Sequence, residues 1–259
     1  MAYRGGREAG AYWTDSILGK TLPQGTKKVF VRFWIKFQPN WTEQGYSKLF
    51  RIQGWEEGTN SWNSTSLRPG IIWGFVQTTY GSRNQLSYRS TDGDSFTNPT
   101  LPNTREQFDW ATDSYRLDRD GVINNYPELI NQTNAQVIQE DHGLVDHKEI
   151  MGTAWHKMEF YVEMNSEPGA TDGVFAQWLD GQIIHRNLVV PWIQADGDAE
   201  SDWRLVKLGG NDSFTLKSVE DDQAQILNSE EIMEWCAFDD VEIYIGGLPN
   251  DVSMEAIPQ

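Results

Sequence analysis

Apolar and polar residues alternate along several stretches of the chain, and this period of two predicts β-strands. The clearest stretch is residues 28–37, which read Lys-Val-Phe-Val-Arg-Phe-Trp-Ile-Lys-Phe. One face of it is apolar without interruption and is predicted to lie in the core: Val29, Val31, Phe33, Ile35 and Phe37. The opposite face carries a mixture of aromatic and basic side chains that a purely structural strand does not need: Phe30, Arg32, Trp34 and Lys36.

Three consecutive antiparallel strands are predicted in the middle of the chain. Residues 155–164 alternate, with His156, Met158, Phe160, Val162 and Met164 as the expected core face. Residues 172–185 follow as a hairpin, because Asp180-Gly181 between two apolar runs is a strong signal for a tight turn. A two-residue turn pairs Trp178 with Ile183 and Ala176 with His185, which places Trp178 and His185 on one face of the sheet.

The other strands expected from the pattern are residues 47–53, 71–80, 85–90, 203–208 and 234–245. No helical period separates them, so the fold class predicted is all-β, an antiparallel two-sheet β-sandwich of the jelly-roll type. Residues 1–26 are expected to form an N-terminal arm or edge strand. Residues 27–259 are expected to form a single jelly-roll domain with a long irregular insertion at about 91–150, where the alternation fails and proline and polar residues are frequent.

Composition agrees with this architecture. A chain of 259 residues can form one sandwich domain, and its 12% aromatic content, 23 glycines and 10 prolines favour strands joined by turns. Cys236 is the single cysteine, which excludes an internal disulfide framework, and no Cys/His spacing indicates zinc.

The formal net charge of −17 argues against nonspecific binding to nucleic acid, which requires cations to neutralise phosphates. The charge is uneven, since residues 1–89 hold 12 Lys and Arg against 5 Asp and Glu, and an anionic ligand remains compatible with this half. No apolar run reaches membrane-spanning length and no signal-peptide core is present in the given chain. We therefore expect no membrane insertion, and a protein that is cytoplasmic, associated with a particle such as a virion, or extracellular after processing.

Three segments together carry a resemblance to a known superfamily. Residues 29–41, residues 155–162 followed by 172–181, and residues 238–244 resemble the concanavalin A-like lectin/glucanase superfamily, and within it the polysaccharide-lyase-like and laminin-G-like jelly rolls. The resemblance implies glycan binding on the concave face of one sheet. It also implies a structural Ca²⁺ near a sheet edge, held by a carboxylate of the closing strand that matches Asp239 or Asp240; alternatively, one of these caps the strand end and the other is solvated.

A hydrolase of this superfamily is expected to carry paired carboxylates at alternate positions of one strand, and no Glu-x-Asp-x-x-Glu run exists here. A polysaccharide lyase needs a cation or amide to neutralise a uronate carboxylate and a proton-transferring side chain beside it. The Arg-x-Glu-Leu-Arg and Tyr-x-Lys-x-Gly-x-Tyr strands of alginate lyases are absent, and residues 182–185 differ from a Gln-Ile-His motif by one inserted residue. If the chain is a lyase, the candidate catalytic residues are Tyr161, His185 and Arg51.

Aromatic and basic residues on the expected strands are the candidates for binding a sugar, because indole and phenol rings stack on pyranose faces and Arg pairs with carboxylate or sulfate. The predicted ligand-binding set is Arg32, Trp34, Arg51, Lys157, Tyr161, Trp178 and His185. Each has a structural alternative. Trp34 and Trp178 could pack under the insertion, Tyr161 could pack across strands, His185 could lie at a strand end, and the remaining cations could be solvated.

The sequence therefore leaves three hypotheses. The first is a lectin-like, carbohydrate-binding jelly roll that recognises a polysaccharide or cell-surface glycan and is displayed on a larger assembly such as a phage particle. The second is a polysaccharide lyase acting on an acidic, uronate-containing glycan. The third is a structural or decoration protein whose aromatic sheet face is an interface with other subunits of an assembly.

Overall fold

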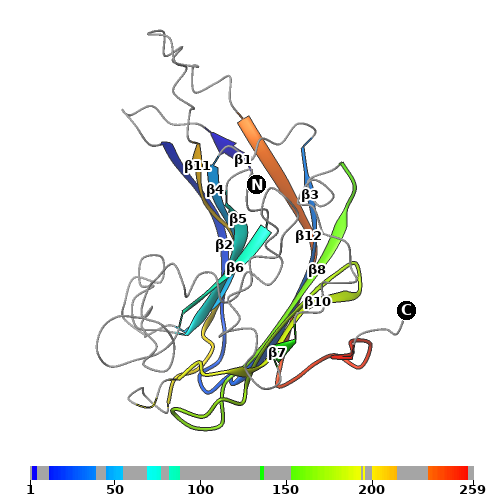
Figure 1. Ribbon diagram of the computed structural model, residues 1–259. Helices are drawn as coiled ribbons and strands as arrows, with labels where there is room; N and C mark the ends of the chain where they lie inside the picture. The colour runs from blue at the N-terminus through cyan, green and yellow to red at the C-terminus, as the bar shows by residue number, and fades with distance from the viewer. Residues whose placement is uncertain are drawn as a thin grey trace.

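The computed structural model describes residues 2–4, 12–38, 45–54, 69–76, 82–87, 135–136, 153–193, 195, 200–214 and 233–255. Within these ranges every regular element is a β-strand, and none of the strands pairs in parallel (Figure 1). The same ranges contain no helix that is both long and apolar enough to cross a bilayer.

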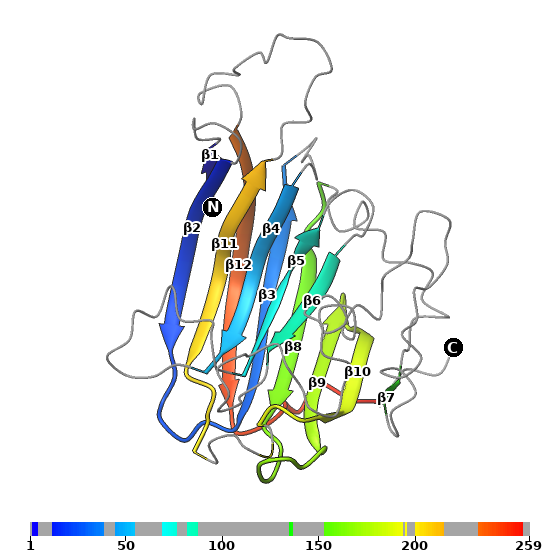
Figure 2. The ribbon, with the colours of Figure 1, turned by 60° about the vertical axis from the view of Figure 1, so that its left-hand side comes forward.

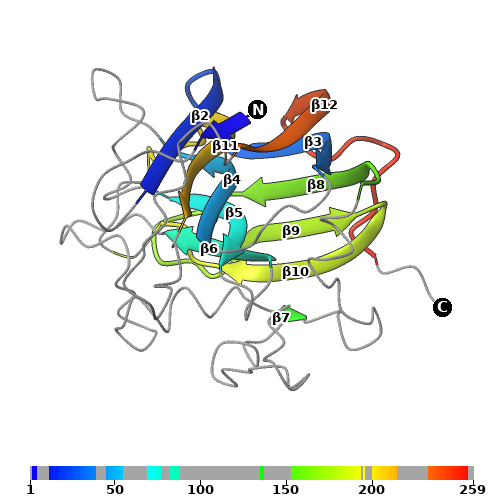
Figure 3. The same ribbon diagram turned by 90° about the horizontal axis from the view of Figure 1, so that it is seen from above.

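The strands form two sheets that face each other (Figures 2 and 3). The seven-stranded sheet has the order β1 (Ala2–Arg4), β12 (Met233–Ile245), β3 (Lys28–Phe37), β8 (His156–Glu163), β9 (Gly173–Leu179), β10 (Gln182–Val190) and β7 (Ala135–Gln136). The five-stranded sheet has the order β2 (Tyr12–Thr21), β11 (Leu205–Phe214), β4 (Gly45–Gln53), β5 (Gly70–Val76) and β6 (Ser82–Ser87). The predicted antiparallel two-sheet sandwich is confirmed.

Aromatic side chains from both sheets fill the space between them. The predicted apolar face of β3 is fully buried there, and Phe33 packs against Phe50 of β4 with ring centroids 5.2 Å apart. Phe50 in turn stacks on Phe160 of β8 at 4.4 Å. Since odd-numbered residues of β3 and even-numbered residues of β8 face the core, the remaining positions of these strands face outward.

A second, smaller apolar cluster lies on the outer face of the seven-stranded sheet. It is covered by residues 246–255, which follow β12 and which we call the strap (red in Figure 1). The cluster consists of Phe30, Tyr161, Ala176, Trp178 and Ile183, with Val174 and the strap residues Leu248, Val252 and Met254 packed against it. The strap is also held by hydrogen bonds, because Trp178 Nε1 donates to the Ser253 carbonyl at 3.0 Å and Arg186 donates to the Met254 carbonyl at 2.5 Å.

The segments at the predicted domain boundaries are placed as follows. Residues 1–26, expected to be an arm or edge strand, contain β1 and β2, and β2 is an edge strand of the five-stranded sheet that pairs with β11 over Tyr12–Thr21. The expected insertion at about 91–150 lies outside the described residues except for β7, which pairs with β10. The single-domain division stays a prediction.

Candidate functional site

Two cations stand opposite each other on the five-stranded sheet. The register of β11 against β4 pairs Lys207 with Arg51. Their strand neighbours Phe50, Ile52 and Val206 belong to the core, so Arg51 and Lys207 occupy the outer face of this sheet. Both side chains are nonetheless buried, at 5% and 1% exposure.

Burial changes the acid–base behaviour of this pair. Removal of Lys207 from water, and secondly the positive charge of Arg51, lower the pKa of the Lys207 amine from its ordinary value of 10.5 to about 8. A lysine in this range can both accept and release a proton near neutral pH, which an ordinary surface lysine does not do. Strongly shifted lysines beside a second cation are characteristic of functional sites.

Among the described residues, the outward neighbours of the pair are the buried side chains of Leu205 and Gln53, together with Ile72 and several glycines. Gly19 of β2 lies opposite Lys207 on the other side of β11, and Ile72 of β5 lies opposite Arg51. The outward positions of β5 on either side of Ile72 are Gly70 and Gly74.

A glycine pair lies directly beyond this site in β11. The pairing of β11 with β4 shifts between Leu208 and Asp212, where Gly209 adopts a φ of 77°. At Gly210 the two strands approach so closely that an added Cβ would lie 2.2 Å from the Lys48 carbonyl oxygen. Only glycine fits there without moving a backbone, so residues 209–210 hold β11 in the bulged register that follows Lys207.

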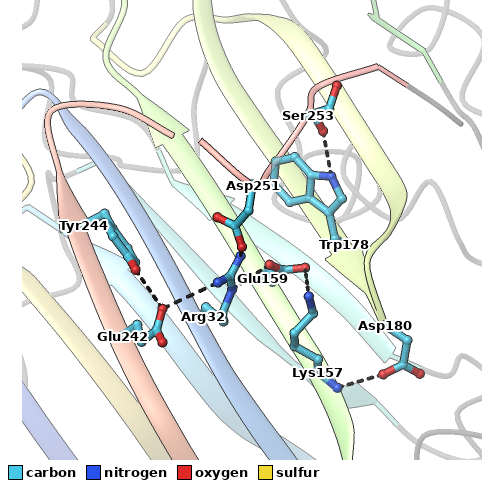
Figure 4. Close-up of polar contacts among 9 residues, drawn as sticks. All are labelled: Arg32, Lys157, Glu159, Trp178, Asp180, Glu242, Tyr244, Asp251 and Ser253. Carbon is cyan, nitrogen blue, oxygen red and sulfur yellow. Dashed lines mark hydrogen bonds and ion pairs between the residues drawn. The ribbon is translucent and has the colours of Figure 1, made fainter. Parts of the chain in front are cut away.

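The outer face of the seven-stranded sheet is organised around Arg32 (Figure 4). Its Nε bonds Glu159 at 2.7 Å, its Nη2 bonds Asp251 of the strap at 2.8 Å, and its Nη1 lies 3.5 Å from Glu242. Burial lowers the pKa of Arg32, but the bonds to Glu159 and Asp251 outweigh it, so the net shift is upward. Arg32, predicted to bind ligand, is thus engaged by three carboxylates and anchors the strap.

Tyr161 and Trp178, also predicted to bind ligand, are covered by the strap. Tyr161 is 5% exposed and donates its hydroxyl to Glu163 at 2.7 Å. Burial is the larger cause, and the bond and charge of Glu163 the smaller, of a pKa of Tyr161 well above its ordinary value, so the phenol stays protonated at neutral pH and cannot accept a proton. Trp178 is 2% exposed and packs beneath the strap.

His185 does not have the predicted strand partner. Trp178 pairs with Ile183 as expected, but the register shifts between Ile183 and His185, and His185 pairs with Gln177 instead of Ala176. An irregularity of one residue reverses the alternation that follows it. The prediction that Trp178 and His185 share a face therefore no longer follows from the register, and the side chain of His185 lies outside the described residues.

The predicted ligand-binding set does not form one surface. Arg32, Trp34, Lys157, Tyr161 and Trp178 lie on outward positions of β3, β8 and β9 in the seven-stranded sheet, whereas Arg51 lies on the outer face of the other sheet. Alternation shows which residues of one strand share a face, but it does not assign the strand to a sheet. Lys207, the cross-strand partner of Arg51, was not predicted, although a lysine between Val206 and Leu208 and just before two glycines was a signal for it.

Asp239 and Asp240, predicted to hold calcium, are exposed at an irregularity in β12. Asp240 has a φ of 45°, and its backbone N–H donates to the Asp239 carboxylate at 2.9 Å. The part of the chain that the structure describes contains no group of three Asp, Glu, His or Cys residues placed to hold a metal ion. These two carboxylates alone do not make up the oxygen-rich shell that Ca²⁺ takes, so calcium stays a prediction.

No protein-family model and no curated protein sequence matches the chain. Among solved structures, a mutant alginate lyase in complex with alginate trisaccharide is similar at 12% identity, covering 95% of this chain and 88% of that one, with a TM-score of 0.45. An endo-β-1,4-glucuronan lyase from the fungus Trichoderma reesei is similar at 12% identity, with 93% and 78% covered and a TM-score of 0.47. An alginate lyase from Aplysia kurodai is similar at 12% identity, with 91% and 83% covered and a TM-score of 0.43. The antiparallel two-sheet sandwich expected from the sequence is confirmed by the strand order of this chain, and its chemistry rests on its own residues.

Proposed function

We propose that the protein is a polysaccharide lyase that cleaves an acidic, uronate-containing glycan on the outer face of the five-stranded sheet. The observation that carries the proposal is the buried, directly opposed pair of Arg51 and Lys207, with the pKa of Lys207 lowered to about 8. Of the three hypotheses left by the sequence, this is the second.

The pair supplies the two functions that β-elimination of a uronate requires. The Arg51 guanidinium can bind the sugar carboxylate with two parallel hydrogen bonds and neutralise its charge, which acidifies the adjacent C5–H bond. The neutral Lys207 amine takes that proton, the C5 electron pair forms the C4=C5 double bond, and the C4–O glycosidic bond breaks. The leaving oxygen then receives the proton from the Lys207 ammonium, so that the enzyme returns to its starting state.

The lowered pKa is what suits Lys207 to this cycle. An amine with a pKa of about 8 is partly neutral at mildly alkaline pH and can therefore act as a base, whereas an amine at 10.5 would be almost fully protonated. The same burial that produces the shift would exclude water from the charged intermediate. Tyr161, named as a catalytic candidate from the sequence, has the opposite shift and lies on the other sheet.

The lectin-like hypothesis loses support because three of its ligand-binding residues are otherwise engaged. Arg32 is bonded to carboxylates, and Tyr161 and Trp178 are buried under the strap. Display on a virion or cell surface, and a decoration role, stay predictions from the sequence. Alginate and glucuronan, the substrates in the names of the similar lyases, are the first glycans to test here, because a cation pair selects uronates of this kind.

The test is to incubate the protein with alginate, glucuronan and a heparin-like glycan and to follow the ultraviolet absorbance of the unsaturated uronate product. We expect absorbance to grow with at least one of them, and Lys207→Ala and Arg51→Ala each to abolish it. Lys28→Gln is the matched control, because Lys28 is a cation on the other sheet that is paired with Glu163. No growth with any acidic glycan, or full activity of Lys207→Ala, would contradict the proposal.

A further inference from the structure

Four side chains form an alternating aromatic and cationic patch on the outer face of the seven-stranded sheet. Trp34 of β3 lies opposite Lys157 of β8. Lys36 lies two residues further along β3 and Trp155 directly precedes β8, and the Lys36 amine lies 6.0 Å from the centroid of the Trp155 ring. We call Trp34, Lys36, Trp155 and Lys157 the Trp–Lys quartet.

Trp155 of this quartet is more exposed than the other described tryptophans for which a buried side chain is found. Trp155 is 40% exposed, whereas the tryptophans of the core and of the strap cluster are all buried: Trp73, Trp178, Trp192 and Trp203. An indole that has no place in a core and is held under a cation is typical of a surface that contacts a ligand. The strap covers the neighbouring cluster around Trp178 but leaves Trp155 in solvent.

The carboxylates near the quartet already have partners within the protein. Lys157 lies 3.3 Å from Glu159, which it shares with Arg32, and Asp180 is bonded to His156 and to the Lys157 backbone N–H. Asp239 is the strand partner of Trp34 on β12, and its carboxylate accepts the Asp240 N–H.

Lys36 differs from these groups. No carboxylate among the described residues forms an ion pair with the Lys36 amine, which lies over the ring of Trp155. In a chain of net charge −17, a cation left beside two partly exposed indoles provides positive charge where the rest of the surface repels anions.

We propose that the Trp–Lys quartet is a second, non-catalytic binding surface for the chain of an acidic glycan. The indoles of Trp34 and Trp155 stack on the apolar faces of sugar rings, and Lys36 and Lys157 bind carboxylate or sulfate groups of the same chain. This surface lies on the opposite sheet from Arg51 and Lys207. It therefore holds a polymer without placing it for cleavage, and it binds whether or not the cation pair is catalytic.

The test measures retardation of the protein in gels that contain alginate, heparin or neutral dextran. We expect Trp155→Ala and Lys36→Gln each to weaken binding to at least one anionic polymer by about fivefold, and the double variant to weaken it further. Ile245→Ala is the control, because Ile245 is a large apolar side chain that is also exposed on the same sheet but lies at the far end of β12. It should bind as the unmodified protein does.

Two results would overturn the proposal. The first is a double variant that binds every anionic polymer as strongly as the unmodified protein does. The second is an unmodified protein that binds neutral dextran as strongly as the anionic polymers, because the lysines would then have no role. Failure of the lyase proposal gives a different pattern: no cleavage product, with polymer binding that still depends on Trp155. Because Trp155 and Lys36 are on the surface, circular dichroism of each variant should match that of the unmodified protein.

Discussion

Lys207 and Arg51 are direct cross-strand partners, and both of these cations are buried on the same face of the five-stranded sheet. Like charges opposite each other destabilise a sheet, and a buried amine loses its hydration. Such a destabilising pair is expected where it serves a function, because functional sites are where protein structures depart from the most stable arrangement.

Replacement of Lys207 should therefore stabilise the protein. Below pH 8 the Lys207 amine is protonated in both the folded and the unfolded protein. The shift of its pKa from 10.5 to about 8 corresponds to a penalty of about 3 kcal/mol on the folded state. Between the two values the unfolded chain binds more protons, so stability rises with pH, and above 10.5 the penalty is gone. We expect Lys207→Met to raise the free energy of unfolding in urea at neutral pH and to lose this advantage at the alkaline end. Lys28→Met should show no such gain in stability at neutral pH. A loss of stability in Lys207→Met at neutral pH would contradict the conclusion that the buried Lys207 amine destabilises the folded protein.

Replacement of Arg51 should change the pH dependence of activity as well as its size. Burial is the larger cause of the lowered pKa of Lys207 and the charge of Arg51 the smaller, so Arg51→Gln should raise the pKa only part of the way to 10.5. Any residual lyase activity should then appear at higher pH than in the unmodified enzyme. The measurement is the pH profile of kcat/KM for both proteins, and an unshifted acidic limb in Arg51→Gln would show that Lys207 is not the base.

Arg32 should be a major stabilising residue. The Glu159 side chain is 2% exposed, and Arg32→Met leaves it with Lys157 as its one ion-pair partner among the described residues. Removal of one partner of a buried ion pair typically costs about 3–5 kcal/mol. The matched control is Lys28→Gln, which breaks the more exposed pair with Glu163 and should cost about 1 kcal/mol or less. Urea unfolding of both variants measures the difference, and equal losses would mean that the Arg32 contacts carry no special weight.

Removal of the strap should expose Trp178. A variant that ends at Gly247 lacks the Ser253 carbonyl bonded to the indole and the apolar residues packed over it. Its tryptophan fluorescence should move to longer wavelength, and the shift should disappear when Trp178→Phe is added. An unchanged spectrum would mean that the indole keeps a dry environment without the strap.

Gly210→Ala should disturb the site without touching either cation. Its Cβ would meet the Lys48 carbonyl, so β11 and β4 must move apart beside the Lys207–Arg51 pair. We expect a loss of stability of several kcal/mol and loss of lyase activity. Gly25→Ala is the comparison, because a Cβ there meets nothing within 4 Å and only its φ of 79° opposes the change. A fully active and stable Gly210→Ala would show that the close approach of the strands is not required.

Alternation in the sequence was sufficient to predict the inward faces of β3 and β8 and the turn at Asp180-Gly181, because each depends on residues near one another in the chain. It could not place Arg51, because assignment to a sheet depends on partners such as Lys207 that are more than a hundred residues away. The predicted pairing of His185 with Ala176 was wrong for another reason. The register shift after Ile183 leaves no trace in the hydrophobic pattern, yet it changes every partner that follows.

The position of the strap and of β12 also has a consequence for how the chain folds as it is synthesised. Val29 of β3 pairs with Ile245, so one flank of β3 stays without its partner strand until β12 has emerged from the ribosome. Phe30 and Trp178 stay uncovered for longer still, because the strap residues that cover them follow β12 in the chain. Contacts this distant in sequence close slowly, and in the interval the newly made sheet presents aromatic side chains and an open edge to other chains. We therefore expect that the demand for chaperones during production of this protein is set by its last-made segment rather than by its core.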